Sequence, residues 1–298
     1  KKYALKAVDD VSFHLNKGEI LGFVGETGCG KTTVGRSIIG LTPTEAGVVN
    51  FGGQNILSLS ERAWRDIRLK VRMVFQDPFA SLDPRRRISD SVAEAGDIHG
   101  LFESAEDRQE QINTTLERVG LDRSFAGRFP HELSGGQRQR VGIARSILPV
   151  PDIIIADEPV SALDVSIQAQ VLNLLLELRE RLDLTIMFIS HDLSVVGQIS
   201  DRIAVMYLGQ IAEIAEAEVL FDNPLHPYTR ALIAAVPKPN PKIKASMELA
   251  AGEPPSRLEL NPGCAFANRC PLAEGTCLTD VPAFRAVSDG RFAACHKL

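Results

Sequence analysis

The residue types most suited to chemistry stand together in one glycine-rich stretch near the N-terminus. The stretch reads G-x-x-x-x-G-K-T and consists of Gly25, Glu26, Thr27, Gly28, Cys29, Gly30, Lys31 and Thr32. This spacing is typical of a phosphate-binding loop, because glycines let successive backbone N–H groups converge on phosphate oxygens. We expect Lys31 to meet the β- and γ-phosphates, Thr32 to offer its hydroxyl to Mg²⁺, and Thr33 to reach the α-phosphate.

Such a loop works between a strand and a helix, and the flanking residues predict both. Residues 20–24 are an apolar run typical of a buried strand, and residues 32–41 have the pattern of a helix. A glycine-rich turn with an incidental lysine is the alternative, and these flanks argue against it. Tyr3 is the aromatic residue nearest to this region, and two interpretations of it stay open: stacking on an adenine ring, or ordinary packing.

Two more apolar runs end in residues that could act on a bound phosphate. Residues 71–75 predict a strand that leads to Gln76, and residues 153–156 predict a strand that leads to Asp157 and Glu158. In α/β sheets, ligands bind beyond the carboxyl ends of the parallel strands. We expect Asp157 to orient Mg²⁺ and Glu158 to polarise the attacking water as general base.

A single histidine stands at the end of another expected strand. Residues 184–189 predict a buried strand, and Ser190, His191 and Asp192 follow it. An isolated histidine is more often structural, but this position is where a sensor of the γ-phosphate is needed. We therefore favour a functional role for His191.

A second helix start with bare glycines follows in the middle of the chain. Ser134, Gly135, Gly136 and Gln137 directly precede the helical pattern 138–148. Backbone N–H groups at such a start can bind phosphate, with the serine hydroxyl beside them. One nucleotide cannot easily use both helix starts of one molecule, so we expect this one to serve a nucleotide held by a partner subunit.

Composition limits the class of protein. The chain has 298 residues, of which 44% are hydrophobic, so it can hold two domains or one large domain with an appendage. A net charge of −5 and a pI near 5.8 argue against nucleic acid as a partner, and Arg85–Arg87 is a short patch that we interpret as solvated or partner-facing. No apolar run approaches the roughly 20 residues that span a bilayer, which favours a soluble or peripheral cytoplasmic protein. The chain begins without methionine, and we expect that an N-terminal piece is missing or processed.

The remaining patterns predict an α/β fold with insertions. Polar, mainly helical residues from about 77 to 142 predict a helical subdomain inserted between sheet strands. Short strand patterns predict antiparallel β structure beside it, at residues 7–15, 48–51, 201–207 and 210–214. The expected fold is a P-loop NTPase core with a mainly parallel sheet, an antiparallel β subdomain, the helical subdomain and a small cysteine-rich C-terminal region.

An ordered set of motifs resembles the ATP-binding-cassette ATPases across residues 1–235, the expected nucleotide-binding domain. The set comprises the phosphate-binding loop, Gln76, Leu133–Gln137, Asp157–Glu158, Ser161–Asp164 and His191. The resemblance implies a head-to-tail dimer that hydrolyses two ATP molecules, each held between one chain's loop and the other chain's segment 133–137. It also implies that Gln76 senses Mg²⁺ and the docked membrane subunit, that Asp164 lies at the dimer interface, and that His191 is a switch residue.

The segment 223–232 and the proline-rich residues from Pro237 onward resemble the C-terminal region of the ATPase subunits of oligopeptide and dipeptide importers. The resemblance is closest to the second of the two ATPase subunits that such importers use. It implies a translocating ATPase at the cytoplasmic face of the bacterial inner membrane. The implied partners are a second ATPase chain in a heterodimer, two transmembrane permeases and an extracytoplasmic substrate-binding protein. Two alternatives stay open: an importer ATPase for nickel or another small solute, and a cassette ATPase outside transport.

Four of the five cysteines stand in the expected C-terminal region, residues 236–298. Cys264, Cys270, Cys277 and Cys295 are separated by five, six and 17 residues. A reducing compartment disfavours disulfides, which leaves a metal as the better explanation. We expect a [4Fe–4S] cluster with a structural role, because paired zinc knuckles are lacking and Pro271 follows Cys270 as in some ferredoxins. Zn²⁺ is the first alternative, and free thiols are the second. The pattern also resembles importer ATPase tails, some of which hold such a cluster.

Overall fold

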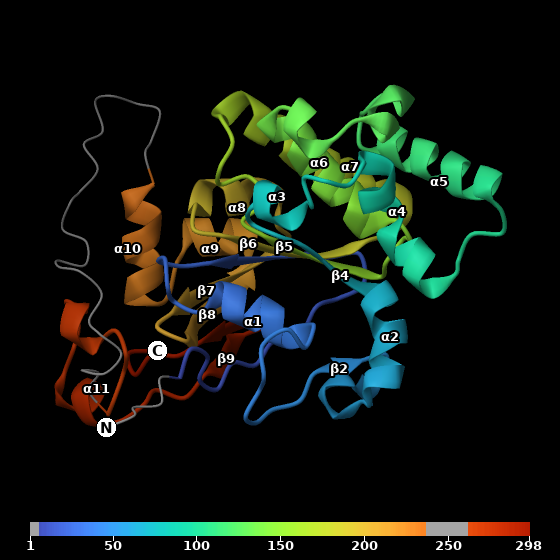
Figure 1. Ribbon diagram of the computed structural model, residues 1–298. Coiled ribbons are helices and arrows are strands. Elements are labelled where there is room, and N and C mark those ends of the chain that lie inside the picture. The colour runs from blue at the N-terminus through green and yellow to red at the C-terminus, as the bar shows by residue number, and fades with distance from the viewer. Residues whose placement is uncertain (1–5, 237–261) are drawn as a thin grey trace, which may run out of the picture. The chain divides into compact units, whose positions relative to one another are not determined.

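The computed structural model describes residues 6–236 and 262–298, and by its internal contacts the chain forms two compact units. The first unit contains the described residues of 1–15, 20–34 and 188–298; the second contains 16–19 and 35–187. The division falls inside strand β6 (Thr185–Ser190) and inside helix α1 (Lys31–Ile38). Tyr3, expected near the adenine, lies outside the described residues. Figure 1 labels many of the helices and strands that follow.

The first unit is built on a mixed sheet. Its strands neighbour one another in the order β1 (Ile20–Val24), β7 (Arg202–Tyr207), β8 (Gln210–Glu216), β10 (Arg291–Ala293) and β9 (Arg285–Ser288). β1 and β7 run parallel, with Leu21 opposite Arg202, and the other pairs are antiparallel. Every residue of β1 is buried, which explains its unbroken apolar sequence. The last strands of the chain thus complete the sheet of the phosphate-binding unit.

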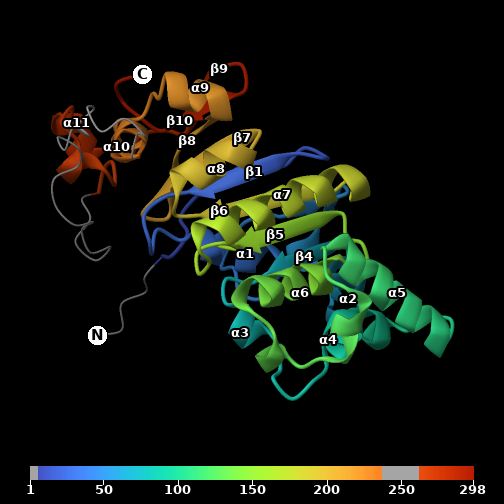
Figure 2. The same cartoon turned by 90° about the horizontal axis from the view of Figure 1, so that it is seen from above.

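Short helices pack around this sheet. They are α8 (Leu193–Ile199), α9 (Ala217–Asp222), α10 (Pro227–Ala235), the 3₁₀ turn η5 (Ala267–Arg269) and α11 (Gly275–Thr279). Gly22 lets α8 approach β1, since a Cβ there would lie 2.2 Å from a methyl of Val196. α10 lies beside the segment that contains α11 in both views (Figures 1 and 2), and the rings of Tyr228 and Phe266 meet there at 5.4 Å.

The second unit carries a parallel strand pair. β4 (Val71–Val74) and β5 (Ile153–Asp157) pair in parallel, and β6 neighbours β5. Helix α2 (Glu61–Lys70) leads into β4, with the Ser60 hydroxyl accepting from the N–H of Ala63 at its start. The other elements around the pair are a small hairpin, β2 (Asn50–Phe51) with β3 (Gln54–Asn55), the turn η1 (Ile56–Ser58), and helices α6 (Gly135–Ile147) and α7 (Val165–Leu182).

A group of helices lies between β4 and β5 in the chain, as the sequence predicts. It comprises α3 (Pro78–Ser81), α4 (Ile88–His99), α5 (Ala105–Arg118) and the turns η2 (Arg123–Gly127) and η3 (Pro130–Glu132). α4 and α5 pack against α6 and lie together in both views (Figures 1 and 2). The apolar residues Ile88, Val92, Ile112 and Leu116 are fully buried there. Within residues 6–236 and 262–298, no helix is long and apolar enough to span a bilayer.

The elements expected at residues 7–15, 32–41 and 138–148 differ from those in the structure. Residues 7–15 form no strand, because Asp10 adopts a left-handed backbone with φ 52°, which interrupts an extended chain. Helix α1 ends at Ile38, so Gly40, at φ 70° beside the Trp64 ring, lies beyond it. Helix α6 begins at Gly135 and includes the two glycines that were expected to precede it. The proposed division of the chain at residue 235 stays a prediction.

Candidate nucleotide-binding and catalytic site

The phosphate-binding loop lies in the first unit, between β1 and α1. Lys31 is only 4% exposed, and its Nζ donates to the carbonyl oxygens of Gly25 at 2.7 Å and Glu26 at 3.1 Å. Gly25 has φ 156°, and a Cβ there would lie 2.0 Å from the carbonyl oxygen of Met206. A side chain at this position would therefore collide with β7. The loop is folded closely over its lysine.

The outer side of the loop is open. Thr27 and Gly28 are exposed, and Gly28 has φ 81° with no atom within 4 Å of a Cβ built on it. Thr32 and Thr33 lie in the first turn of α1 and are partly exposed. Exposed backbone at a helix start, with hydroxyls next to it, is the arrangement that a polyphosphate requires.

His191 lies in the same unit. It directly follows β6 and is exposed, and the next residue, Asp192, caps α8 by accepting from the N–H of Ser194 at 2.8 Å. The N–H of Asp192 donates in turn to the Ser190 hydroxyl at 3.0 Å. The short turn on either side of His191 is thereby fixed, which leaves its imidazole at the surface at a strand end.

The second unit brings Gln76 and Glu158 together. Gln76 follows β4, Glu158 follows β5, and Gln76 Nε2 donates to Glu158 Oε2 over 2.9 Å. The backbone of Glu158 is left-handed, with φ 46°, a conformation that costs free energy for a residue with a Cβ and that clusters at functional sites. Asp157, the residue before it, is fully buried. Parallel pairing of β4 and β5 is what places these side chains at one edge.

The segment expected to reach a partner's nucleotide begins α6. Ser134 is exposed, and its hydroxyl accepts from the N–H of Gln137 at 3.3 Å, while Gln137 Oε1 accepts from the N–H of Ser134 at 2.9 Å. These two bonds form a capping box that explains both residue types locally. Gly136 is also required by packing, because a Cβ there would lie 2.6 Å from a methyl of Ile167 on α7. Sequence reasoning missed this second reason for the glycine.

Asp164 has a local task as well. Its Oδ1 caps α7 by accepting from the N–H of Ile167 at 3.0 Å, and it accepts from the Ser166 hydroxyl at 2.6 Å. The hydrogen bond from Ser166 lowers the pKa of the Asp164 carboxyl below its ordinary value. Asp164 is therefore a charged, exposed residue at a helix start. This position is compatible with an interface role, which stays a prediction.

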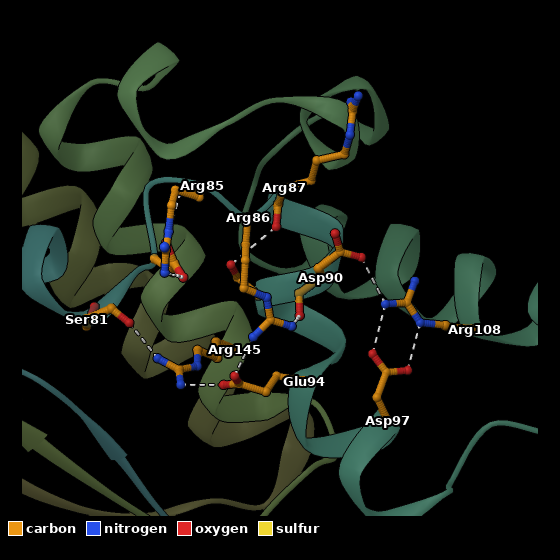
Figure 3. A network of polar contacts seen from close by, with 11 residues as sticks. Ser81, Arg85, Arg86, Arg87, Asp90, Glu94, Asp97, Arg108 and Arg145 are labelled. Atoms are coloured by element: carbon orange, nitrogen blue, oxygen red, sulfur yellow. Dashed lines mark hydrogen bonds and ion pairs between the residues drawn. The ribbon is translucent and has the colours of Figure 1, made fainter.

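An arginine network joins the residues after Gln76 to helix α6, and no motif in the sequence predicts it (Figure 3). Arg145 on α6 donates to the carbonyl oxygen of Ser81 at 2.6 Å and to Glu94 Oε2 at 2.5 Å. Glu94 on α4 also accepts from Arg86 Nη1 at 2.6 Å. Arg86 belongs to the patch expected to be solvated or partner-facing, and it has an internal partner. The signal available in the sequence was only the surplus of arginines near acidic residues.

The four C-terminal cysteines are gathered in the first unit. Cys264, Cys270, Cys277 and Cys295 line one small pocket together with His226, Phe266 and His296. Burial raises the pKa of the Cys264 and Cys270 thiols. Among the described residues, no group of three or more histidines, cysteines or carboxylates is arranged to hold a single metal ion. The spacing in sequence thus correctly predicted that the cysteines come together, while the expected cluster itself stays a proposal.

Two family models match the sequence. Residues 8–161 match the model described as ABC transporter, and residues 212–277 match the model described as the C-terminal region of oligopeptide/dipeptide transporters. The first match contains the phosphate-binding loop, Gln76 and Glu158. The second ends at Cys277 and contains Cys264 and Cys270.

Two proteins that are similar over nearly the whole chain are oligopeptide transport ATP-binding proteins. The chain is 52% identical to the oligopeptide transport ATP-binding protein AppF of Bacillus subtilis, over 98% of this chain and 89% of that protein. It is 46% identical to the oligopeptide transport ATP-binding protein OppF of Haemophilus influenzae, over 100% of this chain and 90% of that protein. Among solved structures, the fold is similar to the dimeric post-hydrolysis state of the ATP-binding cassette MJ0796 bound to ADP and Pi, with a TM-score of 0.65 and 28% sequence identity. The match covers 73% of this chain and 94% of the MJ0796 chain. The expected cassette fold is confirmed, and the chain belongs to the ABC transporter family as an ATPase subunit of its oligopeptide/dipeptide branch.

Proposed function

We propose that the chain hydrolyses ATP to power the import of oligopeptides or dipeptides. The observation that carries this proposal is 52% identity to AppF across almost the full length, joined to the C-terminal match at 212–277. Nickel or another small solute is the alternative cargo, because nothing in this chain is expected to contact the cargo. A cassette ATPase outside transport is the other alternative. It does not explain why residues 212–277 match the C-terminal region of oligopeptide/dipeptide transporters.

The partners follow from this role. Two transmembrane permeases would form the path for the peptide, and an extracytoplasmic binding protein would deliver it. A second cassette ATPase, which we expect to be a different chain, would complete the pair of nucleotide sites. The chain would then work as a peripheral subunit at the cytoplasmic face of the inner membrane.

In the proposed ATP-bound state, residues of the phosphate-binding loop hold the polyphosphate. Lys31 would exchange its present bonds to two backbone carbonyls for the β- and γ-phosphates. Thr32 and the buried Asp157 offer hard oxygen donors, the kind that Mg²⁺ prefers. Mg²⁺ supplies positive charge to the phosphate oxygens when bound with the nucleotide.

The hydrolytic step is assigned to Glu158. Its carboxylate would accept a proton from the attacking water, and Gln76, which donates to that carboxylate, would orient it. His191 would sense the γ-phosphate from the end of β6. Ser134 and the start of α6 would bind the nucleotide of the partner subunit, and Asp164 would lie at that interface.

We further propose that Cys264, Cys270, Cys277 and Cys295 hold a [4Fe–4S] cluster, with Zn²⁺ as the alternative. The support is that four sulfur donors from three separate stretches of the chain line one pocket. Soft thiolate ligands suit both iron–sulfur clusters and zinc, so the donor set fits either group. Bonds from the four cysteines to one cluster would cross-link residues 264–295, a segment with a small apolar core of its own.

Uptake in cells that lack the chain tests the proposed transport. Cells with the gene deleted should lose uptake of a labelled pentapeptide, and the wild-type chain should restore it. Glu158→Gln should not restore uptake, because transport needs hydrolysis. Loss of ⁶³Ni²⁺ uptake with peptide uptake intact would replace the peptide by nickel, and no transport defect of either kind would favour a role outside transport.

A further inference from the structure

An ion pair joins the cysteine-rich segment to the phosphate-binding loop within the first unit. Arg269 donates from Nη1 to Glu26 Oε2 and from Nη2 to Glu26 Oε1, both over 3.0 Å. Glu26 is the second residue of the loop, and Arg269 directly precedes Cys270. Two parallel bonds between a guanidinium and a carboxylate are the strong and geometrically specific form of this interaction. The two residues lie 243 positions apart in the chain.

The pair is largely withdrawn from water. The side chain of Arg269 is 9% exposed and that of Glu26 is 27% exposed. The Arg269 guanidinium also lies 5.8 Å from the Tyr207 ring centre and 5.9 Å from that of Phe266, and its Nη1 donates to the Tyr207 hydroxyl at 3.2 Å. Removal of one partner from such a pair leaves a poorly solvated charge behind, which is costly. The arginine therefore has one well-defined position.

On the loop side, the pair acts on the same residue that contacts the phosphate-binding lysine. The N–H of Glu26 donates to the Tyr228 hydroxyl at 3.0 Å, and the carbonyl oxygen of Glu26 accepts from Lys31 Nζ at 3.1 Å. The side chain and both backbone polar groups of Glu26 are thus fixed at once. A shift of Arg269 would be passed to the peptide group that Lys31 contacts.

On the tail side, Arg269 is held by the turn between two of the pocket cysteines. It ends the 3₁₀ turn η5, in which the N–H of Ala267 donates to the carbonyl of Cys264 at 3.0 Å and that of Cys270 donates to the carbonyl of Ala267 at 3.2 Å. The N–H of Cys264 donates to the carbonyl of Cys277 at 2.8 Å. The backbone of Arg269 therefore follows the arrangement of the cysteine segment.

We propose that Arg269 is a positioning residue of the nucleotide site. It holds Glu26, and through it the phosphate-binding loop, in the shape that accepts a polyphosphate. Nucleotide affinity then depends on an intact cysteine segment, although no cysteine of that segment touches the nucleotide. This inference rests on the proposed ATP-binding role of the loop, and it holds whichever group the thiols bind.

The test is the dissociation constant of a fluorescent ATP analogue for the purified full-length chain in the presence of Mg²⁺. Arg269→Gln should weaken binding by roughly three- to a hundredfold, the range for residues coupled through one network. Arg269→Lys should have an affinity between those of Arg269→Gln and the wild type, because an ammonium cannot make the two parallel bonds. Arg230→Gln is the matched control: Arg230 is an exposed arginine of the same unit that bonds to the backbone carbonyl of Pro224 and should leave affinity unchanged.

Two double variants test the path itself. Glu26→Gln combined with Arg269→Gln should bind no worse than Arg269→Gln alone, since both changes break one interaction. Cys270→Ser should weaken binding in the wild-type background and add little in the Arg269→Gln background.

If Arg269→Gln binds the ATP analogue with wild-type affinity, Arg269 has only a structural role and the inference is overturned. This holds whether or not the variant has lowered thermal stability. Lys31→Ala separates this outcome from failure of the proposed function. If Lys31→Ala abolishes binding while Arg269→Gln does not alter it, only the inference fails. If the wild-type chain binds no ATP analogue, the proposed function fails.

Discussion

Gln76 Nε2 lies 2.9 Å from Glu158 Oε2, although 82 positions separate the two residues in the chain. The parallel pairing of β4 with β5 creates this contact, because it places both strand ends at one edge of the sheet. The amide donates to the carboxylate proposed as general base, and the backbone of Glu158 is left-handed, with φ 46°.

Glu158→Gln should retain ATP binding and slow hydrolysis by about 10²–10⁴-fold, the usual range for loss of a general base. The substitution keeps the shape of the side chain but removes its negative charge and its ability to take a proton. ATP turnover of the purified complex with its permeases measures the effect. Glu177→Gln on α7, the same change at an exposed glutamate, is the control. Unchanged turnover in Glu158→Gln would remove this residue from the proposed role.

Gln76→Ala should lower the turnover number by less than Glu158→Gln does, because the base remains but is no longer oriented. In the Glu158→Gln background the same change should have little further effect, since residues that act as a unit are not additive. Turnover of the two single variants and the double variant gives the comparison. Fully multiplicative losses would show that the 2.9 Å contact has no part in hydrolysis.

Ser134 should act on the nucleotide of the partner subunit. If the chain pairs with itself, a mixed dimer of a Lys31→Ala chain and a Ser134→Arg chain should collect both lesions in one composite site and leave the other intact. Stoichiometry of bound ATP analogue in the mixed dimer measures this, with about one molecule retained per dimer. Equal damage at both sites would contradict the head-to-tail arrangement.

Glu94→Gln should lower the free energy of unfolding of the chain by about 1–2 kcal/mol, because Glu94 is the common acceptor of Arg86 and Arg145. Burial raises the pKa of the Glu94 carboxyl, but the two arginines outweigh it and leave the pKa below its ordinary value. The folded state therefore binds the proton less readily than the unfolded state. This stabilisation is present above the ordinary glutamate pKa and is lost as pH falls through the lowered one.

Urea unfolding at several pH values checks the role of Glu94. The wild-type chain should lose the extra stability below about pH 4.5, and the difference from Glu94→Gln should shrink there. Glu103→Gln, at an exposed glutamate in the same unit, is the control. A pH-independent difference between Glu94→Gln and wild type would assign the loss to packing and not to charge.

Protein purified without oxygen should be brown and contain iron and acid-labile sulfide in equal amounts. Cys270→Ser should remove most of both, because one of the four proposed ligands is lost. Cys29→Ser is the matched control, since Cys29 is the buried fifth cysteine in the phosphate-binding loop and should not affect iron content. A colourless anaerobic preparation with stoichiometric zinc would establish the alternative metal.

The sequence by itself determined the local elements and the family. The loop 25–32 needs only its own glycines and lysine, so its strand and helix could be predicted around it, although α1 proved shorter than expected. Gln76 and Glu158 could be placed at strand ends, because apolar runs reveal buried strands without any tertiary information. The clustering of four cysteines was visible from their spacing.

Only the tertiary structure decided which distant side chains meet. The bond between Arg269 and Glu26, and the sharing of Glu94 by two arginines, depend on the packing of elements far apart in the chain. No periodic pattern or motif records such a pairing, because each residue alone is an ordinary charged residue. Likewise, the sequence explains Gly136 only as a phosphate contact. The structure adds that a Cβ there would lie 2.6 Å from a methyl of Ile167, so helix packing also excludes a side chain. Motifs encode local backbone and chemistry, whereas long-range pairs arise from the positions that the whole fold imposes.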